Sequence, residues 1–229
     1  MRHPDRGRGA GQRLSAALPV SWRRRGRLIA FEGVEGAGKS TQLELLRRTL
    51  EEQGHKVVAT REPGGTPVGE QVRSLLLDPA STVQPRAEAL LFAAARAQLV
   101  EDVIRPALEC GDVVLCDRFI DSSLAYQGAA RGLGRDEVAA INRFATAGLL
   151  PDVVVLLRLD PAEGLARRQG SRDRIECQDL DFHHRVAEAF LDLATAEPER
   201  FVVVDAAQPP ERVAAEVRAT VLARIEGGR

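Results

Sequence analysis

The sequence predicts an α/β fold with three layers, in which a five-stranded parallel sheet carries helices on both faces. Five short apolar runs rich in β-branched residues alternate with longer stretches of helical patterning, and they span residues 28–31, 57–60, 113–116, 153–159 and 201–204. Such runs are typical of strands buried on both faces, and their alternation with helices is typical of parallel sheets. The 229 residues, 44% of them hydrophobic, suffice for one sizeable core.

Glycine and proline mark the ends of these elements. Gly54 closes the helix that follows the first run, Gly111 and Asp112 form a turn before the third, and Pro151 with Asp152 precedes the fourth. Parallel sheets bind ligands beyond the carboxyl ends of their strands. We therefore expect the functional residues in the segments that follow the strands, which are residues 33–40, 61–66, 117–127, 160–176 and 205–208.

The sequence predicts one domain over residues 27–229, preceded by a disordered arm over residues 1–26. Residues 1–27 contain eight arginines against one acidic residue, Asp5, and have too little apolar content to fold alone. Three interpretations of the arm stay open: a solvated extension, which a misassigned start codon would also produce, a contact with nucleic acid or an anionic surface, and organellar targeting. No apolar run approaches the roughly 18 residues of a membrane span, so we expect no membrane partner.

The cysteines indicate a compartment. Cys110, Cys116 and Cys177 are odd in number and lack metal-ligand spacing. Small buried thiols in a reducing environment are the simplest interpretation. We therefore expect a cytoplasmic protein.

A glycine-rich loop follows the first apolar run. Its residues are Gly33, Val34, Glu35, Gly36, Ala37, Gly38, Lys39 and Ser40, which match the phosphate-binding pattern G-x-x-x-x-G-K-[ST], and Thr41 continues into a helix-forming stretch. Glycines allow successive backbone N–H groups to turn inward around an anion, and the following helix points its positive dipole end at the phosphates. Lys39 is expected to reach the β- and γ-phosphate oxygens, and Ser40 to hold Mg²⁺. The loop therefore predicts a nucleoside triphosphate site.

Two features separate the classes of protein that carry such a loop. A GTPase needs an Asn-Lys-x-Asp sequence to read guanine, but the only lysines are Lys39 and Lys56, and neither follows an asparagine. Motor and transporter ATPases usually end a strand in an Asp-Glu pair, whereas the third run ends in Asp117 and Arg118. This pair favours a second, phosphate-bearing substrate, with Asp117 in the Mg²⁺ shell and Arg118 on an acceptor monophosphate. The alternative is that the pair only satisfies the ends of a strand and a helix.

Residues 160–176 predict a short mobile lid. A helix start is followed by a Gln-Gly-Ser break at residues 169–171 and then by Arg172, Asp173 and Arg174. Closing lids exclude water, and the arginines they carry neutralise charge on a transferring phosphoryl group. Arg167, Arg168, Arg172 and Arg174 compete for that role, and we favour Arg172 and Arg174. A solvated charged helix would account for the same run.

Further motifs occur along the chain together with the glycine-rich loop. They are Arg61-Glu62-Pro63-Gly64-Gly65-Thr66, then Leu91-Phe92-Ala93-Ala94-Ala95-Arg96, and then the segment from Asp117 to Gly128. With them the chain closely resembles the bacterial thymidylate kinases, a family of P-loop nucleoside monophosphate kinases, from about Arg27 to the C-terminal helix. The resemblance implies transfer of the γ-phosphoryl group of ATP, with Mg²⁺, to dTMP in dTTP synthesis, by a cytoplasmic homodimer. Residues 87–107 form an apolar stretch that could supply a shared face.

The resemblance also implies which residues bind the base and sugar of dTMP. Phe92 would stack on thymine and Arg96 would hydrogen-bond its ring oxygen, and their i, i+4 spacing places both on one face of a helix. Ser123, Tyr126 and Gln127 would contact the base and sugar, with the Tyr126 ring against C2′, where it selects deoxyribose. From residue type alone, Phe92 would be a core aromatic, and Tyr126 could pack its helix with the hydroxyl at the surface.

Other residues are implied to hold the polar parts of the two substrates. Four residues match family positions that bind the deoxyribose, the phosphate and nearby water or metal. They are Glu35, Glu62, Arg73 and Arg118. A solvent-facing arginine is the alternative for Arg73. Adenine would rest near residues 205–208, with Gln208 in contact. Some relatives carry an arginine directly after the loop lysine, where this chain has Ser40, so the catalytic cation is expected from the lid.

Two other functions stay open at this point. One is another nucleoside monophosphate kinase with the same architecture. The other is a P-loop switch or partition ATPase that binds a partner and has no acceptor. The pair of Asp117 and Arg118 argues against the second.

Overall fold

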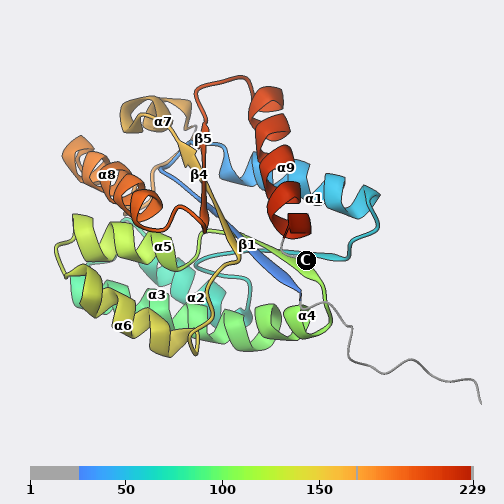
Figure 1. The fold of residues 1–229 in the computed structure, drawn as a ribbon. Helices are drawn as coiled ribbons and strands as arrows, with labels where there is room; N and C mark the ends of the chain where they lie inside the picture. The colour runs from blue at the N-terminus through green and yellow to red at the C-terminus, as the bar shows by residue number, and fades with distance from the viewer. Residues whose placement is uncertain (1–25, 169, 228–229) are drawn as a thin grey trace, which may run out of the picture.

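The computed structural model describes residues 26–168 and 170–227, which form a three-layer α/β fold (Figure 1). Its sheet has five strands in the order β2-β3-β1-β4-β5, and every neighbouring pair is parallel. The strands are β1 (Arg27–Glu32), β2 (Val57–Arg61), β3 (Val113–Asp117), β4 (Val153–Arg158) and β5 (Phe201–Asp205). The fold class predicted from the apolar runs is confirmed, and the fourth strand ends one residue before the predicted end of its run.

The helices cover both faces of the sheet. They are α1 (Lys39–Glu52), α2 (Pro67–Leu77), α3 (Pro85–Leu99), η1 (Val100–Ile104), α4 (Arg105–Glu109), α5 (Ile120–Ser123), η2 (Leu124–Ala130), α6 (Arg135–Ala145), α7 (Pro161–Arg167), α8 (Leu180–Ala196) and α9 (Pro210–Gly227). Helices α1 and α9 pack together against one face, and α8 packs against β4 and β5 on the other. The segments η1 and η2 are π-helical and continue α3 and α5.

Local sequence signals set several helix starts. Helix α2 has a proline in its first turn, and the Thr66 side chain accepts a hydrogen bond from the Gly69 N–H. Asp160 caps α7 in the same way, and Asp179 caps α8 by accepting from the Phe182 N–H at 2.7 Å. These caps satisfy backbone donors that a helix start would otherwise leave unpaired.

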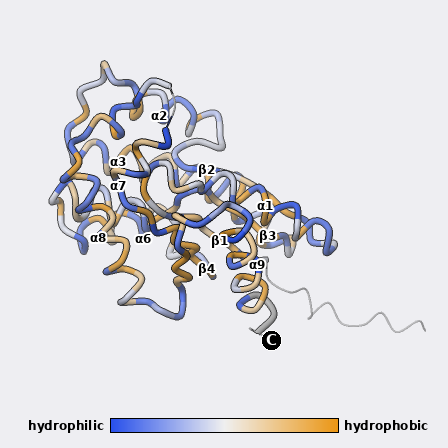
Figure 2. The backbone as a smooth tube through the Cα atoms, turned by 90° about the horizontal axis from the view of Figure 1, so that it is seen from above, coloured by the Kyte–Doolittle hydropathy of each residue, from blue (hydrophilic) through white to orange (hydrophobic). Residues whose placement is uncertain are grey.

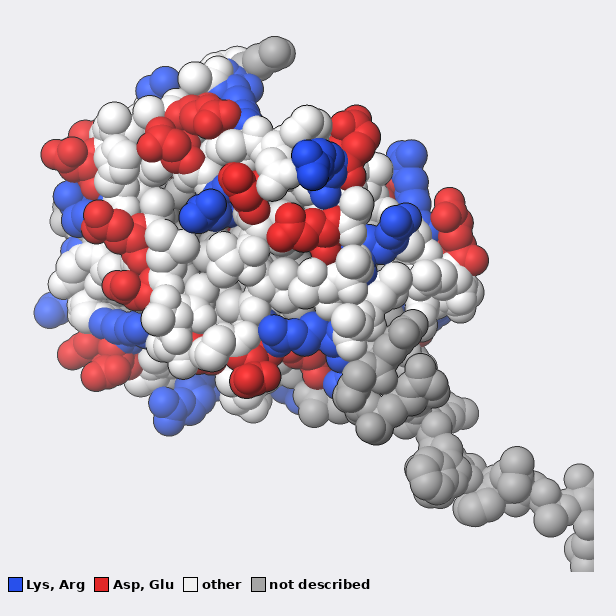
Figure 3. Space-filling model, turned by 45° about the horizontal axis from the view of Figure 1, so that its top comes forward, with Lys and Arg blue, Asp and Glu red and all other residues white. Residues whose placement is uncertain are grey.

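The core lies between the sheet and its two helical layers. Leu28, Ile29, Ala30 and Phe31 of β1 are fully buried, as expected for a central parallel strand. Along the outer helices hydrophobic and hydrophilic residues alternate (Figure 2), which is typical of helices that bury one face. Seen toward the top of the molecule, basic and acidic side chains are interspersed (Figure 3).

The predicted N-terminal arm falls mostly on residues that the structure does not describe. Residues 1–25 lie outside the described ranges, so the prediction for them is untested. Gly26, the last residue of the predicted arm, belongs to the folded part, because it is buried and its N–H donates to the Leu108 carbonyl at 3.0 Å. A Cβ at this position would lie 2.3 Å from the Asp112 carbonyl oxygen, so only glycine fits. Within the described ranges, no helix has the length and apolar character to cross a bilayer.

The five strands place their carboxyl ends at one edge of the sheet (Figure 1). The loop after β1, the segment after β2 and the turn after β3 therefore lie beside one another, although up to about 85 residues separate them in sequence. An ion pair joins α5 to Arg200, the residue directly before β5. Arg200 donates to both carboxylate oxygens of Asp121, at 2.7 and 2.8 Å, and Asp121 is fully buried.

We predict that Arg200→Met destabilises the chain by about 3–5 kcal/mol, because it leaves the Asp121 carboxylate buried without its cation. Urea unfolding measures the loss. Arg48→Met is the matched control, because Arg48 pairs with Glu44 on the surface, where its side chain is 65% exposed, and it should change stability little. Equal effects of the two substitutions would contradict the structural role of the Arg200 pair.

Candidate active site

A cavity of about 450 Å³ opens at the carboxyl edge of the sheet. Its walls come from the glycine-rich loop, the segment after β2, helices α2 and α3, the turn after β3, η2 and the region after α7. Most of the predicted site residues line it. They are Glu35, Gly36, Gly38, Lys39, Ser40, Thr41, Glu62, Arg73, Phe92, Arg96, Asp117, Arg118, Ser123, Tyr126 and Gln127. Gly33, Val34, Ala37, Arg172, Arg174 and Gln208 do not line this cavity.

The glycine-rich loop has the backbone geometry expected of a phosphate cradle. Gly33, Gly36 and Gly38 have φ values of 139°, 70° and 89°, in the region that favours glycine. A Cβ on Gly36 would lie 2.0 Å from the Gly164 carbonyl oxygen of α7, so this position also requires glycine for space. The Lys39 ammonium donates to the carbonyls of Gly33 and Val34, at 3.0 and 2.8 Å. Burial, with a further contribution from Arg118, lowers the pKa of Lys39 to about 8.

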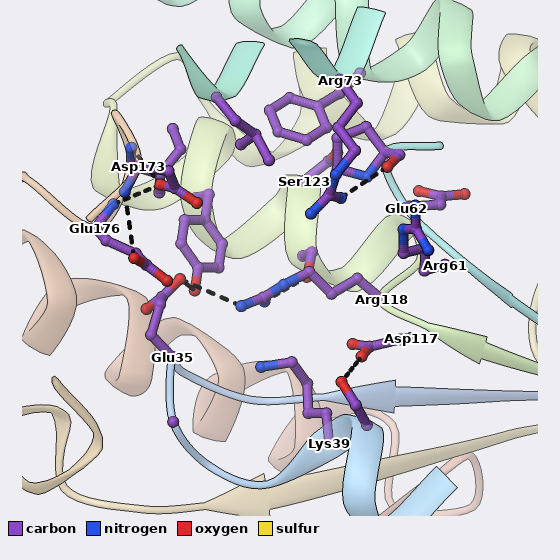
Figure 4. Close-up of a pocket in the computed structure, with 18 of the residues that line it drawn as sticks. Glu35, Lys39, Arg61, Glu62, Arg73, Asp117, Arg118, Ser123, Asp173 and Glu176 are labelled. Carbon is purple, nitrogen blue, oxygen red and sulfur yellow. Dashed lines mark hydrogen bonds and ion pairs between the residues drawn. The ribbon is translucent and has the colours of Figure 1, made fainter. Parts of the chain in front are cut away.

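Ser40 and Asp117 meet where α1 begins and β3 ends. The Ser40 hydroxyl donates to Asp117 Oδ2 at 2.7 Å. The sequence placed these residues 77 positions apart, and the parallel sheet brings them together as predicted. Asp117 lies beside the same opening as Lys39 (Figure 4), and Ser40 lines the same cavity.

Arg118 joins the glycine-rich loop to η2. Its guanidinium donates to the Gly33 carbonyl at 3.0 Å and to Glu35 Oε1 at 3.2 Å, and it lies 5.1 Å from the centre of the Tyr126 ring. The Tyr126 hydroxyl donates to the same Glu35 oxygen at 2.6 Å. In Figure 4, Arg118 lies between Lys39 and Ser123, in the middle of the cavity. The alternative in which the Tyr126 hydroxyl reaches the surface is wrong, because Tyr126 is 5% exposed.

Glu35 is a buried carboxylate held in its ionised form. Burial alone would raise its pKa, but the contact with His183 and the charges of Arg118 and Lys39 lower it well below the usual range. His183 Nδ1 lies 3.2 Å from Glu35 Oε2, and the histidine is fully buried. Sequence reasoning missed His183, because a histidine in the amphipathic helix α8 carries no signal that it points to a loop about 150 residues earlier.

Arg96 of α3 lines the cavity, although its side chain is almost fully buried. It is 1% exposed and donates to Glu62 Oε2 at 2.7 Å, to the Ser123 hydroxyl at 3.0 Å and to the Phe119 carbonyl at 3.1 Å. It also bonds Asn142 Oδ1. The guanidinium therefore ties α3 to the segment after β2, to the turn after β3 and to α6, and much of its donor capacity is used within the protein.

Two further residues extend the cavity wall on the side of α2 and α3. Arg73 of α2 donates to the Pro63 carbonyl at 2.9 Å and lines the cavity, so the solvent-facing alternative is wrong. Burial lowers the pKa of Arg73. Phe92 is half-buried and lines the cavity rather than filling the core. Its ring is thus available to a planar ligand.

The lid region differs from the expectation. Arg172 is exposed, and Arg174 donates to Glu88 Oε2 at 2.6 Å and to the Leu76 carbonyl at 2.7 Å, away from the cavity. Arg167 and Arg168 line the cavity instead. The preference for Arg172 and Arg174 over these two rivals therefore finds no support in this arrangement, because Arg174 has a buried carboxylate partner that the sequence did not reveal.

Gln208 and the residues around it follow β5. Gln208 is half-buried and lies outside the lining of the cavity. Arg167 donates to the Ala206 carbonyl at 3.0 Å, which links the end of α7 to this segment. The predicted contact of Gln208 with adenine stays a prediction.

Comparison with known proteins identifies the family. The thymidylate kinase family model matches residues 31–217. A thymidylate kinase of Deinococcus radiodurans is 55% identical over 87% of this chain and 98% of its own length. One of Clavibacter sepedonicus is 54% identical over 89% and 98%. A crystal structure of thymidylate kinase from Ehrlichia chaffeensis superposes with a TM-score of 0.71 at 33% identity, covering 86% of this chain and 98% of that one.

These matches span the described domain and include the glycine-rich loop, the turn after β3 and the region after α7. The resemblance inferred from the motifs is therefore confirmed, and the chain belongs to the thymidylate kinase family.

Proposed function

We propose that this chain transfers the γ-phosphoryl group of ATP to dTMP, giving dTDP and ADP, and so supplies the precursor of dTTP. One observation carries the proposal: a single cavity is lined both by a triphosphate-binding loop and by a second set of residues suited to a nucleoside monophosphate. The second set offers an aromatic face at Phe92 and cations at Arg73 and Arg118. A hydrolase that acts on ATP alone would have no use for them.

The chain's own groups supply positioning and charge neutralisation. Lys39 and the backbone of the glycine-rich loop hold the phosphates of the donor, and Arg118 holds the acceptor phosphate beside them. Phosphoryl transfer needs no covalent protein intermediate when donor and acceptor are aligned in this way. Arg167 and Arg168 lie on the cavity wall, and we propose that these lid residues, rather than Arg172 and Arg174, approach the transferring group.

The site fits Mg²⁺. Ser40 and Asp117 present two oxygen ligands 2.7 Å apart, and the described residues contain no cluster of three or more histidine, cysteine or acidic side chains. Mg²⁺ is commonly held by one or two protein oxygens, with substrate phosphates and waters completing the shell. Bound at Ser40 and Asp117, the ion would neutralise charge on the phosphate oxygens of ATP.

We also propose that the chain acts in the cytoplasm. Cys110, Cys116 and Cys177 are all free thiols, as expected in a reducing compartment. Cys110 and Cys177 are exposed, so the prediction that all three are buried is wrong.

The experiment that tests the function is an ADP-release assay with ATP, Mg²⁺ and a panel of nucleoside monophosphates. We expect dTMP to be the preferred acceptor, omission of Mg²⁺ to abolish turnover, and Lys39→Ala to lower kcat at least ~10²-fold with the fold retained. Preference for a different monophosphate would favour another kinase of this architecture. ATP hydrolysis that no monophosphate stimulates would favour the switch ATPase.

Tyr126 provides a test of sugar selection. The ring lies under Arg118 in the cavity wall, and we propose that it faces C2′ of the acceptor. Tyr126→Ala should then reduce the preference for dTMP over its ribo analogue by about 10-fold, since pocket discrimination of this kind is worth ~1–3 kcal/mol.

Tyr126→Phe is the matched control, because it keeps the ring and removes only the hydroxyl bonded to Glu35. It should retain the preference while lowering kcat/KM for both substrates. If Tyr126→Ala lowers kcat/KM for both acceptors equally, the ring does not select the sugar.

We propose that the chain forms a homodimer through α3 and α6. Phe144 of α6 is 92% exposed and Leu90 of α3 is 56% exposed, and the two helices pack side by side. Most other apolar residues of the stretch 87–107 are buried in the chain's own core, so only its outward side is available to a partner. Exposed large apolar side chains on neighbouring helices are typical of such interfaces.

Phe144→Asp should therefore shift the chain from dimer to monomer in light scattering, because a charge replaces an apolar contact on both sides of the interface. Leu180→Asp is the control, since Leu180 is 42% exposed on α8. A monomeric wild type, or a dimer unaffected by Phe144→Asp, would exclude this face.

A further inference from the structure

Glu88 of α3 is a buried carboxylate behind the wall of the cavity. Its side chain is 1% exposed, and it does not line the cavity. It accepts hydrogen bonds from Gln127 Nε2 at 2.9 Å and from Arg174 Nη2 at 2.6 Å. Arg131 contacts both of its oxygens at 3.3 Å. Glu88 therefore cannot touch a substrate, but it holds Gln127, which does line the cavity.

The chemistry of the two side chains fixes the orientation of the Gln127 amide. An ionised carboxylate only accepts hydrogen bonds, so the amide nitrogen of Gln127 must face Glu88. The opposite orientation would place the Gln127 amide oxygen against the Glu88 carboxylate. Both groups are acceptors, so neither of the two facing oxygens would have a hydrogen-bond donor in this buried site. Oε1 is thus the atom that Gln127 can offer to the cavity as an acceptor.

The carboxylate is itself held from two sides. Arg174 also donates to the Leu76 carbonyl at 2.7 Å, and its backbone N–H donates to the Leu77 carbonyl at 3.1 Å. Arg131 lies 4.7 Å from the centre of the Phe182 ring and donates to Gln178 at 2.7 Å. Because both arginines are anchored elsewhere, Glu88 cannot turn to follow a rotating amide, and the Gln127 orientation is rigid.

We propose that Glu88 is a specificity-determining positioning residue, which orients Gln127 so that its carbonyl oxygen accepts the ring N–H of the acceptor's pyrimidine. The proposal rests on the proposed function and refines its base recognition. Thymine and uracil carry an N–H between their two ring carbonyls, whereas cytosine carries an acceptor nitrogen at that position. A fixed acceptor therefore pairs with the first two and opposes the third.

The test is Glu88→Gln, with kcat/KM measured for dTMP, dUMP and dCMP. The new glutamine can face Gln127 with either its oxygen or its nitrogen, so the Gln127 amide becomes free to present a donor. We expect the ratio of kcat/KM for dTMP over dCMP to fall by at least ~10-fold. The ratio for dTMP over dUMP should stay constant, since both bases carry the same N–H.

Arg131→Met is the matched control. It removes another partner of the same carboxylate and leaves the contact between Glu88 and Gln127 in place. The ratio for dTMP over dCMP should then stay at the wild-type value. If Glu88→Gln does not fold because Arg174 is left without its partner, the double variant Glu88→Gln with Arg174→Gln restores the charge balance, and the same fall in the ratio is expected.

The outcomes separate this inference from the proposed function. The wild-type enzyme could prefer dTMP while Glu88→Gln lowers kcat/KM equally for all three acceptors. In that case Glu88 has only a structural role, and this inference fails while the proposed function stands. A wild-type chain that does not phosphorylate dTMP would overturn the proposed function itself. A fall in the ratio in Arg131→Met as large as in Glu88→Gln would also contradict the assignment to Gln127.

Discussion

The arrangement of the site depends on the ion pair between Glu35, which is buried, and Arg118, which is partly buried. Removing charges from water is costly unless each finds partners, and here the partners come from three parts of the chain. Arg118 follows β3 with a φ of 70°, and its backbone N–H donates to the Phe31 carbonyl at 2.9 Å. Its guanidinium reaches the glycine-rich loop. The ion pair thereby ties the glycine-rich loop, which we propose binds the donor, to the turn after β3, which we propose binds the acceptor. Such a tie would keep the two substrates aligned for in-line phosphoryl transfer.

Glu32 is a second buried carboxylate, and it holds the turn that carries Arg118. Glu32, the last residue of β1, accepts from the backbone N–H groups of Phe119 and Ser122 at 2.8 and 3.1 Å, and from the Ser122 hydroxyl at 2.6 Å. Burial, together with the nearby charge of Asp121, raises the pKa of Glu32 to about 7. The turn that carries Arg118 is therefore shaped by a side chain of the neighbouring strand. Glu32 thus positions the cation without lining the cavity.

The sheet and the loop around Lys39 could be predicted from the sequence, because the alternation of apolar runs with helical stretches and the glycine pattern of the loop are local signals. Ser40 and Asp117 were also predictable, since parallel strands share an edge. The partners of Arg96 and Arg174 were not, because they depend on which buried acceptors the tertiary fold brings near. Glu88 and His183 are single polar residues in otherwise ordinary helices, and only the structure reveals that one holds Gln127 and the other contacts Glu35.

In the proposed reaction, one cavity holds donor and acceptor at the same time. Calorimetric titration with adenosine and thymidine joined through their 5′ ends by a chain of phosphates tests this arrangement. We expect one linked molecule to bind per chain, ATP and dTMP each to displace it, and both Lys39→Ala and Phe92→Ala to weaken its binding. Displacement by only one of the two substrates would contradict this arrangement, because the linked molecule would then occupy a single nucleotide site.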